Sequence, residues 1–345
     1  MTWESRGLSL TIRNTILIKM KKIYWIKNNT HFSSRVLNLM NSIERFTDVV
    51  VEECANLNEL KIDSENFIVF FQIVPAHSVE NLIEILKMPD LQKKVVIVSV
   101  GDKPFYDHDV GEASELIKEI ECPVINVTGA RHNDNTIAGY GFMHENMPES
   151  VNLLPFEKKI SKFNFAGSLI GDERCLFLTK FKQLAPTNFN LQKTHADQNI
   201  PEILIPDLSP KADFFKYMEN MEKFKFSLVP LGHGHTFRFL ESMSAGSLII
   251  AKDLYNLRFN KPYFFKPGFN YVVVRDDLAD VEDIINMCLE RPELSEIAQN
   301  GKNTYLKYFS TTKGCLPFIT IGAILKELNH KIGKQFFRYT LKYNC

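Results

Sequence analysis

Arg238 and Glu241 are the most informative charged residues of this 345-residue chain. They lie three apart in a stretch predicted to be helical, so their side chains project from the same face. On such a face a guanidinium can clamp a pyrophosphate, while a carboxylate can accept two ribose hydroxyls. The pair therefore predicts a nucleoside diphosphate site. Without its surroundings, the same spacing also fits a surface ion pair worth about 0.2–0.5 kcal/mol.

The residues around the pair favour the binding site over the ion pair. An apolar strand is predicted to end at Pro230, and the loop after it contains Gly232 and Gly234, whose backbone can approach a ligand closely. The helix is predicted to begin near Thr236, and the N–H groups and partial positive charge of its first turn favour an anion. Gly246 is expected to end the helix before the next buried strand.

Two histidines, His233 and His235, alternate with these glycines. We assign them to ligand binding, by stacking on or hydrogen bonding with a sugar or a phosphate. A His-x-His pair also suggests a metal site, but no third His, Cys or carboxylate follows at a supporting spacing. The sequence therefore predicts no metal ion here.

Buried strands and helices must hold these residues in place. From residue 22 onward, apolar runs alternate with helical stretches, which is typical of a parallel sheet covered by helices. In the first half the apolar runs are KIYWIKN, DVVVEEC, NFIVFFQIV, KKVVIVSV and PVINVTG. No G-x-G-x-x-G motif follows the first run, so a dinucleotide-binding domain is not expected.

A second series of the same kind follows a polar stretch over residues 130–155, which contains glycines and two prolines. That composition predicts a loop that leads into an interdomain linker. A chain of this length exceeds the size at which one core keeps growing, so two domains are expected. The predicted parts are a poorly structured extension (1–19), a first domain (20–155), a second domain (156–316) and a C-terminal helix (317–345).

The composition limits the partners and the compartment. Lys plus Arg (41) equal Asp plus Glu (41), so no overall field attracts DNA or RNA, and no nucleic acid partner is expected. The six cysteines form no C-x-x-C pair, which predicts reduced thiols in a cytoplasmic protein. The apolar stretch near the N-terminus is too short and too polar for a signal peptide or a membrane span. Over residues 326–345 five Lys or Arg accompany one Glu, which fits either a solvated helix face or peripheral attachment to an anionic membrane.

The segment around Arg238 resembles the nucleotide-binding signature of the exostosin-like glycosyltransferases, glycosyltransferase family 47. In that signature a strand, a proline, a glycine-containing loop, an arginine, a glutamate and Ala-Gly follow in this order. The matching residues here are Pro230, Gly232, Gly234, Arg238, Glu241, Ala245 and Gly246. Upstream, a second match to the family's Gly-Ser loop and following arginine is carried by Gly167, Ser168 and Arg174. The resemblance extends over residues 163–310 and is not detected in the first domain.

The resemblance implies a GT-B fold, which is α/β with two Rossmann-like parallel-sheet domains facing across a cleft and a C-terminal helix that packs back on the first domain. It implies a hexosyl- or pentosyltransferase that moves a sugar from a nucleoside-diphosphate sugar, by default a UDP-sugar, to a glycan or other hydroxyl acceptor. The donor would be bound by Gly167, Ser168, Arg174, Gly232, His233, Gly234, His235, Thr236, Arg238 and Glu241. No cofactor or metal ion is required, because arginine and helix N-termini can neutralise the departing diphosphate.

The stereochemistry and the catalytic base follow less directly. Retaining GT-B enzymes carry a glutamate eight positions before the second one, where this chain has His233, and that difference favours inversion. An inverting enzyme needs a base from the first domain, in a loop after a strand. We prefer the group Asp107, His108 and Asp109, while other loops offer Asp102, His132, Asp134, His144 and Glu145. The open alternatives are a retaining transferase, a UDP-sugar epimerase and a catalytically silent sugar-nucleotide-binding protein.

Overall fold

The computed structural model divides the chain into two compact units, one of Met1–Glu145 with Gly314–Cys345 and one of Asn146–Lys313. The boundaries predicted from the sequence, after residues 155 and 316, lie slightly later in the chain than these. The structure describes residues 22–27, 41, 43–44, 49–54, 60, 66–72, 80–92, 94–99, 112–120, 122, 124–126, 136–138, 154–169, 171–193, 199–210, 212–230, 237–252, 265–291 and 293–310.

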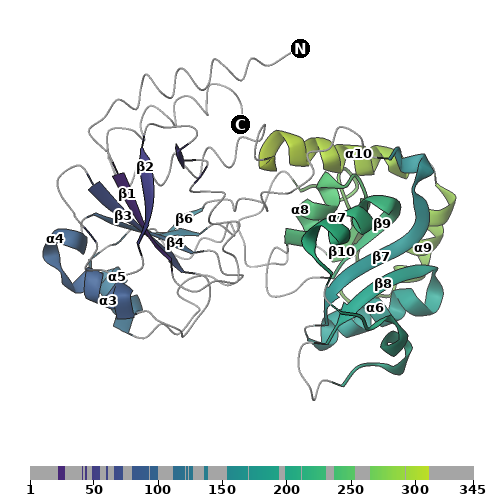
Figure 1. Ribbon diagram of the computed structural model, residues 1–345. Coiled ribbons are helices and arrows are strands. Elements are labelled where there is room, and N and C mark those ends of the chain that lie inside the picture. The colour runs from purple at the N-terminus through teal and green to yellow at the C-terminus, as the bar shows by residue number, and fades with distance from the viewer. Residues whose placement is uncertain are drawn as a thin grey trace, which may run out of the picture. The chain divides into compact units, whose positions relative to one another are not determined.

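The first unit contains a parallel sheet (Figure 1). Among its described residues, six strands lie in the order β2-β1-β3-β4-β5-β6, and each neighbouring pair is parallel. The strands are β1 (Lys22–Lys27), β2 (Val50–Cys54), β3 (Asn66–Gln72), β4 (Val95–Ser99), β5 (Val124–Asn126) and β6 (Thr136–Ala138). The helices are α3 (Glu80–Lys87), α4 (Pro89–Gln92) and α5 (Glu112–Glu119).

The Val-rich and Ile-rich runs form the strands of this sheet because their side chains are covered by helices. In β4, the side chains from Val95 to Val98 are at most 3% exposed. Leu82 and Ile85 of α3 and Ile117 of α5 belong to the same buried cluster as the strand residues. The predicted alternation of strand and helix is therefore confirmed for this unit.

The prediction of an uninterrupted loop over residues 130–155 is wrong at β6, which pairs with β5. This strand has three residues, too few to produce a recognisable alternation of apolar and polar side chains. The polar residues that precede this strand in the sequence also make the segment resemble a loop.

The second unit is built on another parallel sheet (Figure 1). Its described strands lie in the order β11-β10-β9-β7-β8. The strands are β7 (Ile160–Ser168), β8 (Thr187–Gln192), β9 (Phe224–Val229), β10 (Leu248–Lys252) and β11 (Val272–Val274). The α-helices are α6 (Asp172–Leu184), α7 (Phe214–Lys223), α8 (Phe237–Ser244), α9 (Val281–Glu290) and α10 (Leu294–Thr304). Shorter helical turns are η3 (Phe156–Lys158), η4 (Glu202–Asp207) and η6 (Tyr305–Phe309).

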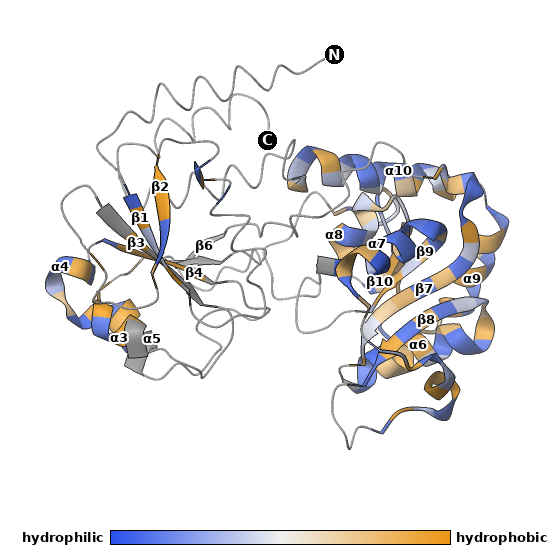
Figure 2. Ribbon diagram, in the orientation of Figure 1, coloured by the Kyte–Doolittle hydropathy of each residue, from blue (hydrophilic) through white to orange (hydrophobic). Residues whose placement is uncertain are grey.

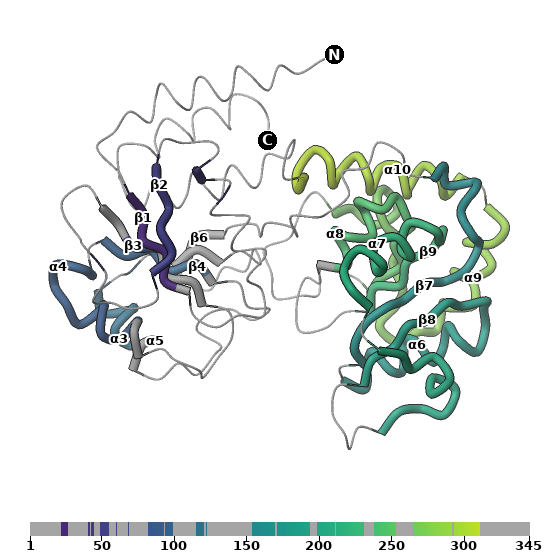
Figure 3. The backbone as a smooth tube through the Cα atoms, in the orientation of Figure 1, coloured from purple at the N-terminus to yellow at the C-terminus, as the bar shows by residue number. Residues whose placement is uncertain are grey.

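Helices cover both faces of this second sheet. All five residues of β10 are buried, as expected for a central parallel strand. Helix α6 packs with α9, whereas α10 packs with α8 and β10. Figure 2 shows hydrophilic and hydrophobic colour alternating along α10, as expected for a helix with one buried face. Figure 3 follows the chain through these elements from β7 in teal to α10 in yellow-green.

Phenylalanines form the centre of the core in the second unit. Phe163 is 0% exposed and lies between two other rings. Its ring centroid is 4.8 Å from that of Phe226 on β9 and 5.4 Å from that of Phe181 on α6. These contacts tie β7 and β9 to the covering helix α6.

The predicted extension over residues 1–19 and the predicted C-terminal helix over residues 317–345 lie outside the described residues. Within the part of the chain that the structure describes, no helix has the length and apolar character needed to cross a membrane.

We expect the buried thiols of Cys122 and Cys288 to resist alkylation in the native protein. Burial raises the pKa of each thiol to about 12, so almost none of the reactive thiolate is present at about pH 8. Site-resolved mass spectrometry after iodoacetamide treatment would measure the labelling, with the chain in guanidinium chloride as the control. Labelling of Cys288 in the native protein as fast as in the unfolded chain would contradict this prediction.

Candidate functional site

The second sheet has a topological switch point between β7 and β9. From β7 the chain continues to β8 on one side, whereas from β9 it continues through β10 to β11 on the other. Ligands of open parallel sheets bind outside the carboxyl ends of the strands at such a point, because the two following loops diverge there. Here those ends are Ser168 of β7 and Val229 of β9. The first sheet has its own switch point between β1 and β3.

Helix α8 lies on this edge of the second sheet, after β9. It begins at Phe237 and is followed by Gly246, whose φ is 65°. The N–H of Ser247 donates to the carbonyl of Ser242 at 3.1 Å, and that of Gly246 donates to Met243 at 3.0 Å. This is a Schellman motif, which needs a residue with positive φ at the position after the helix. The predicted end of the helix at Gly246 is confirmed, whereas Thr236, near which the helix is predicted to begin, lies outside the described residues.

Arg238 is held against β7 by two residues of that strand. Its guanidinium carbon lies 4.1 Å from the centre of the Phe165 ring, within the range of a cation–π interaction. At Gly167, a Cβ atom would lie 2.2 Å from Nη2 of Arg238. The missing side chain at Gly167 therefore makes the space that the guanidinium occupies, beside the carboxyl end of β7.

Glu241 faces the same way as Arg238, and Tyr217 of α7 joins them. The Tyr217 hydroxyl donates to Oε2 of Glu241 at 2.8 Å, and Nε of Arg238 donates to the same hydroxyl at 3.4 Å. Glu241 is only 6% exposed, so the pair is not the surface ion pair considered above. Burial, and next the Glu241 carboxylate, raise the pKa of Tyr217 above its ordinary value, so the hydroxyl keeps its proton.

Arg174 lies in the first turn of α6 and is 7% exposed. Its Nη1 donates to the backbone carbonyl of Ser168 at 2.8 Å, which ties the start of α6 to the end of β7. The structure thus brings the predicted residues Gly167, Ser168 and Arg174 to the switch point. Arg174 thus binds the backbone at the end of β7.

Lys252 is a further positive charge at this edge, and no sequence motif marks it. It ends β10, and its Nζ lies 3.2 Å from Oε1 of Glu173 in the first turn of α6. Because β9 lies between β10 and β7, this contact crosses the end of β9. The Lys252 side chain is 11% exposed and that of Glu173 is 79% exposed, so the carboxylate reaches in from solvent.

Lys159 supports the site from the opposite end of the helices. Its Nζ donates to the carbonyl of Glu222 at 2.8 Å and to that of Ala245 at 2.7 Å, at the C-terminal ends of α7 and α8. Burial lowers the pKa of Lys159 to about 8, against a smaller raising effect of Glu222. One buried amine therefore anchors both helices that carry the polar groups of the site.

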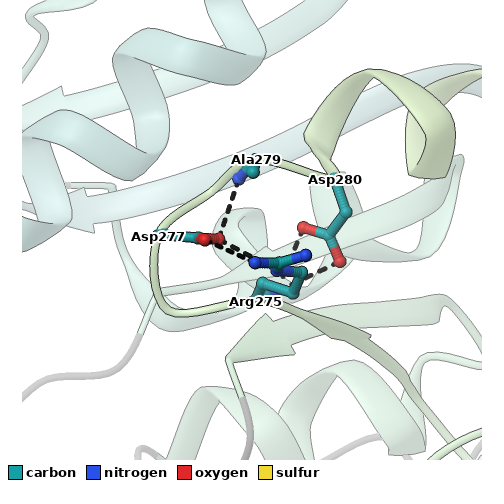
Figure 4. A network of polar contacts seen from close by, with 4 residues as sticks. All are labelled: Arg275, Asp277, Ala279 and Asp280. Carbon is teal, nitrogen blue, oxygen red and sulfur yellow. Dashed lines mark hydrogen bonds and ion pairs between the residues drawn. The ribbon is translucent and has the colours of Figure 1, made fainter.

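A separate charged cluster after β11 has a structural explanation (Figure 4). The side chain of Arg275 donates to both carboxylate oxygens of Asp277, and its backbone N–H donates to Asp280. The N–H of Ala279, and next the Arg275 side chain, lower the pKa of Asp277. These charges satisfy one another in an exposed turn that leads into α9.

Several predicted site residues lie outside the described residues. They are Asp107, His108 and Asp109 in the first unit, and Gly232, His233, Gly234, His235 and Thr236 in the second. Among the residues that the structure does describe, no group of three or more His, Cys, Asp or Glu is arranged to hold a metal ion.

We expect Gly167→Ala to remove the Arg238 guanidinium from its position. The new Cβ would overlap Nη2, and the φ of 149° at this residue is strained for any other amino acid. Affinity for a nucleoside diphosphate, measured by calorimetry, should fall about as far as in Arg238→Ala, roughly 10-fold or more. Gly268→Ala is the control, because Gly268 also has positive φ (72°) but nothing within 4 Å of its Cβ position. Unchanged affinity in Gly167→Ala would contradict the assigned packing.

Residues 206–313 match the family model described as glycosyl transferase-like, and this range includes α7, β9 and α8. This chain carries a glycosyltransferase-like domain there. No curated protein sequence matches the chain.

Solved structures similar to the chain include glycosyltransferases of low sequence identity. A glycosyltransferase from Rickettsia africae ESF-5 is 9% identical with a TM-score of 0.60, covering 90% of this chain and 100% of its own. An alpha-glucosyltransferase in complex with UDP-glucose and DNA is 10% identical with a TM-score of 0.58, covering 89% and 99%. A chain of the GtfA/B complex is 13% identical with a TM-score of 0.45. That match covers 74% of this chain and only 61% of the other chain. The predicted α/β fold with two Rossmann-like parallel sheets, as in GT-B glycosyltransferases, is confirmed.

Proposed function

We propose that the protein is an exostosin-like, inverting glycosyltransferase that uses a nucleoside-diphosphate sugar, by default a UDP-sugar. The proposal depends on the position of the Arg238 guanidinium at the switch point, where it packs against Phe165 and Gly167 beside the end of β7. A cation held there suits a diphosphate. Further support comes from the glycosyl transferase-like match over residues 206–313 and from a structural neighbour that was solved with UDP-glucose.

In this proposal the second unit binds the donor. Arg238 and the first turn of α8 contact the diphosphate, and Glu241 accepts hydrogen bonds from the ribose hydroxyls. The loop after β7 approaches the phosphates through Gly167 and Ser168, and Arg174 holds that loop. The remaining donor contacts are assigned to Gly232, His233, Gly234, His235 and Thr236.

The proposed reaction is a single displacement of a hexosyl or pentosyl group. A base from the group Asp107, His108 and Asp109 takes the proton of an acceptor hydroxyl on a glycan or similar molecule. The oxygen forms a bond to the anomeric carbon as the bond from that carbon to the diphosphate oxygen breaks. The electron pair leaves with the diphosphate, whose charge the arginine and the helix N-terminus stabilise without a metal ion or cofactor.

A thermal-shift screen against UDP-, GDP-, CMP- and dTDP-linked sugars tests the proposal. A ligand at a hundred times its dissociation constant stabilises the folded state by about 2.7 kcal/mol. Stabilisation by none of these donors would overturn the proposal. With a binding donor and an acceptor, NMR of the product decides the mechanism, because inversion changes the anomeric configuration and retention keeps it. Conversion of the donor without an acceptor would indicate an epimerase, and tight binding with neither transfer nor hydrolysis a silent binder.

Glu241→Gln should weaken the binding of UDP more than that of inorganic pyrophosphate. The carboxylate of Glu241 can accept hydrogen bonds from two ribose hydroxyls. The NH₂ group of a glutamine can only donate, so the variant should lose about 1.5–3 kcal/mol of the binding free energy contributed by the ribose. Calorimetric titration with both ligands gives the comparison. Glu219→Gln is the control, because Glu219 of α7 forms an exposed pair with Lys223. Equal weakening of both ligands by Glu241→Gln would argue against the ribose role.

A further inference from the structure

We propose that Tyr217 is a positioning residue that links the diphosphate half of the donor site to its ribose half. This inference rests on the proposed function. The Tyr217 hydroxyl lies 2.8 Å from Oε2 of Glu241 and 3.4 Å from Nε of Arg238. It therefore contacts Arg238 and Glu241 at the same oxygen.

The hydroxyl uses both of its hydrogen-bonding capacities in this contact. Its proton is donated to the carboxylate, and its oxygen accepts the guanidinium N–H. A phenol can do both at once, whereas phenylalanine can do neither. Because a guanidinium N–H can only donate and a carboxylate can only accept, the direction of the two bonds is fixed in the native protein.

Tyr217 is itself held from two sides on α7. The ring of Phe214 lies 6.1 Å from the Tyr217 ring, centroid to centroid. At the start of the helix, Asp213 accepts from the N–H of Lys216 at 2.9 Å, which caps the first turn. At its end, Lys159 binds the carbonyl of Glu222. The hydroxyl is therefore presented to α8 from an anchored helix.

Two consequences follow for a bound ligand. Glu241 needs a defined rotamer to accept ribose hydroxyls, and Arg238 needs one to clamp a diphosphate. Because one hydroxyl restrains both, Tyr217 favours a ligand that carries both groups over a ligand that carries one. The class of ligand selected is a ribonucleoside diphosphate, in preference to the 2′-deoxyribonucleotide or inorganic pyrophosphate.

The test is Tyr217→Phe, with dissociation constants for UDP, 2′-deoxyuridine diphosphate and inorganic pyrophosphate. We expect UDP to bind about tenfold more weakly, and the preference for UDP over the deoxy form to fall by about the same factor. Ser247→Ala is the control, since it removes a buried hydroxyl that follows α8 and donates to the carbonyls of Met221 and Phe224 at the end of α7, away from Arg238 and Glu241. A purely structural Tyr217 would, like Ser247, change thermal stability and leave the ratio of dissociation constants unchanged.

A double variant covers the case in which Tyr217→Phe alone does not fold. In Tyr217→Phe combined with Glu241→Gln, no buried carboxylate is left without its donor. The tyrosine substitution should then have little further effect on UDP binding, because the side chain that it orients has already been changed. A full additional loss in the double variant would overturn the inference. Failure of the native protein to bind any of the three ligands would overturn the inference, and the proposed function would fall with it only if no donor of the thermal-shift screen bound either. Native binding with unaltered selectivity in Tyr217→Phe would overturn only the role of Tyr217.

Discussion

Arg238→Ala is expected to weaken the binding of a nucleoside diphosphate by about 1.5 to 3 kcal/mol, which is roughly 10- to 150-fold in the dissociation constant. The guanidinium is set in place before any ligand arrives, by the Phe165 ring, the gap at Gly167 and the Tyr217 hydroxyl. Little side-chain entropy is then lost on binding. Calorimetric titration with UDP and GDP measures the change.

The matched control for this variant is Arg275→Ala. The Arg275 side chain is 65% exposed and is engaged by Asp277, as Figure 4 shows, in a turn that needs no ligand. Its removal should leave nucleotide affinity unchanged. If Arg238→Ala also left the affinity for UDP and GDP unchanged, the assignment of the site to this edge of the sheet would be wrong.

Phe163→Ala should lower the free energy of unfolding of the second unit by about 3 to 5 kcal/mol. The side chain is completely buried, and its loss would leave a cavity between Phe226 and Phe181. Since domains of this size are stable by about 5–15 kcal/mol, the loss is a large share of the total. Urea denaturation followed by circular dichroism would report the midpoint of each transition, because a chain of two units need not unfold in one step.

Phe215→Ala is the control for this second variant. The residue is in the same unit but 64% exposed, so its truncation should change the stability by no more than about 0.5 kcal/mol. Equal effects of the two substitutions would show that the packing around Phe163 does not stabilise this unit.

The sequence predicts the central strands of both units well, and the edge elements poorly. The run VVIVS of β4 is apolar throughout, because both faces of that strand are covered. The run TNFNLQ of β8 is only partly buried and contains four polar residues, so its sequence does not mark this edge strand. Helix α7 carries clearer signals, because Asp213 is a recognisable N-cap and Met218 and Met221 mark its buried face.

For the site, the sequence predicts what lies within one helix and misses what crosses between elements. The spacing of Arg238 and Glu241 places them on one face, and Gly246 ends the helix as expected. The partners Tyr217 and Phe165 come from α7 and β7, and no local pattern connects them to α8. The role of Lys159 is likewise not visible in the sequence, because the two carbonyls that it binds are distant from it in the chain.

The catalytic base is the least predictable part of the site from sequence. Asp107, His108 and Asp109 follow β4, which lies one strand away from the switch point between β1 and β3. A catalytic base is expected in a loop that follows a strand, but several such loops of the first unit contain acidic residues and histidines. The sequence alone therefore does not single out one residue as the base. Substitution of each candidate, with transfer measured against donor binding, separates a base from a solvated loop residue.

The described polar groups assigned to the donor all come from the second unit, Asn146–Lys313. On the proposed function, the choice of donor and the choice of acceptor are then encoded in separate stretches of the gene. Mutations in the first unit could adapt the enzyme to a new acceptor while Arg238, Glu241 and Tyr217 continue to select the same nucleotide. Such an arrangement allows acceptor range to diversify in evolution, or by exchange of first units in the laboratory, at little risk to donor recognition.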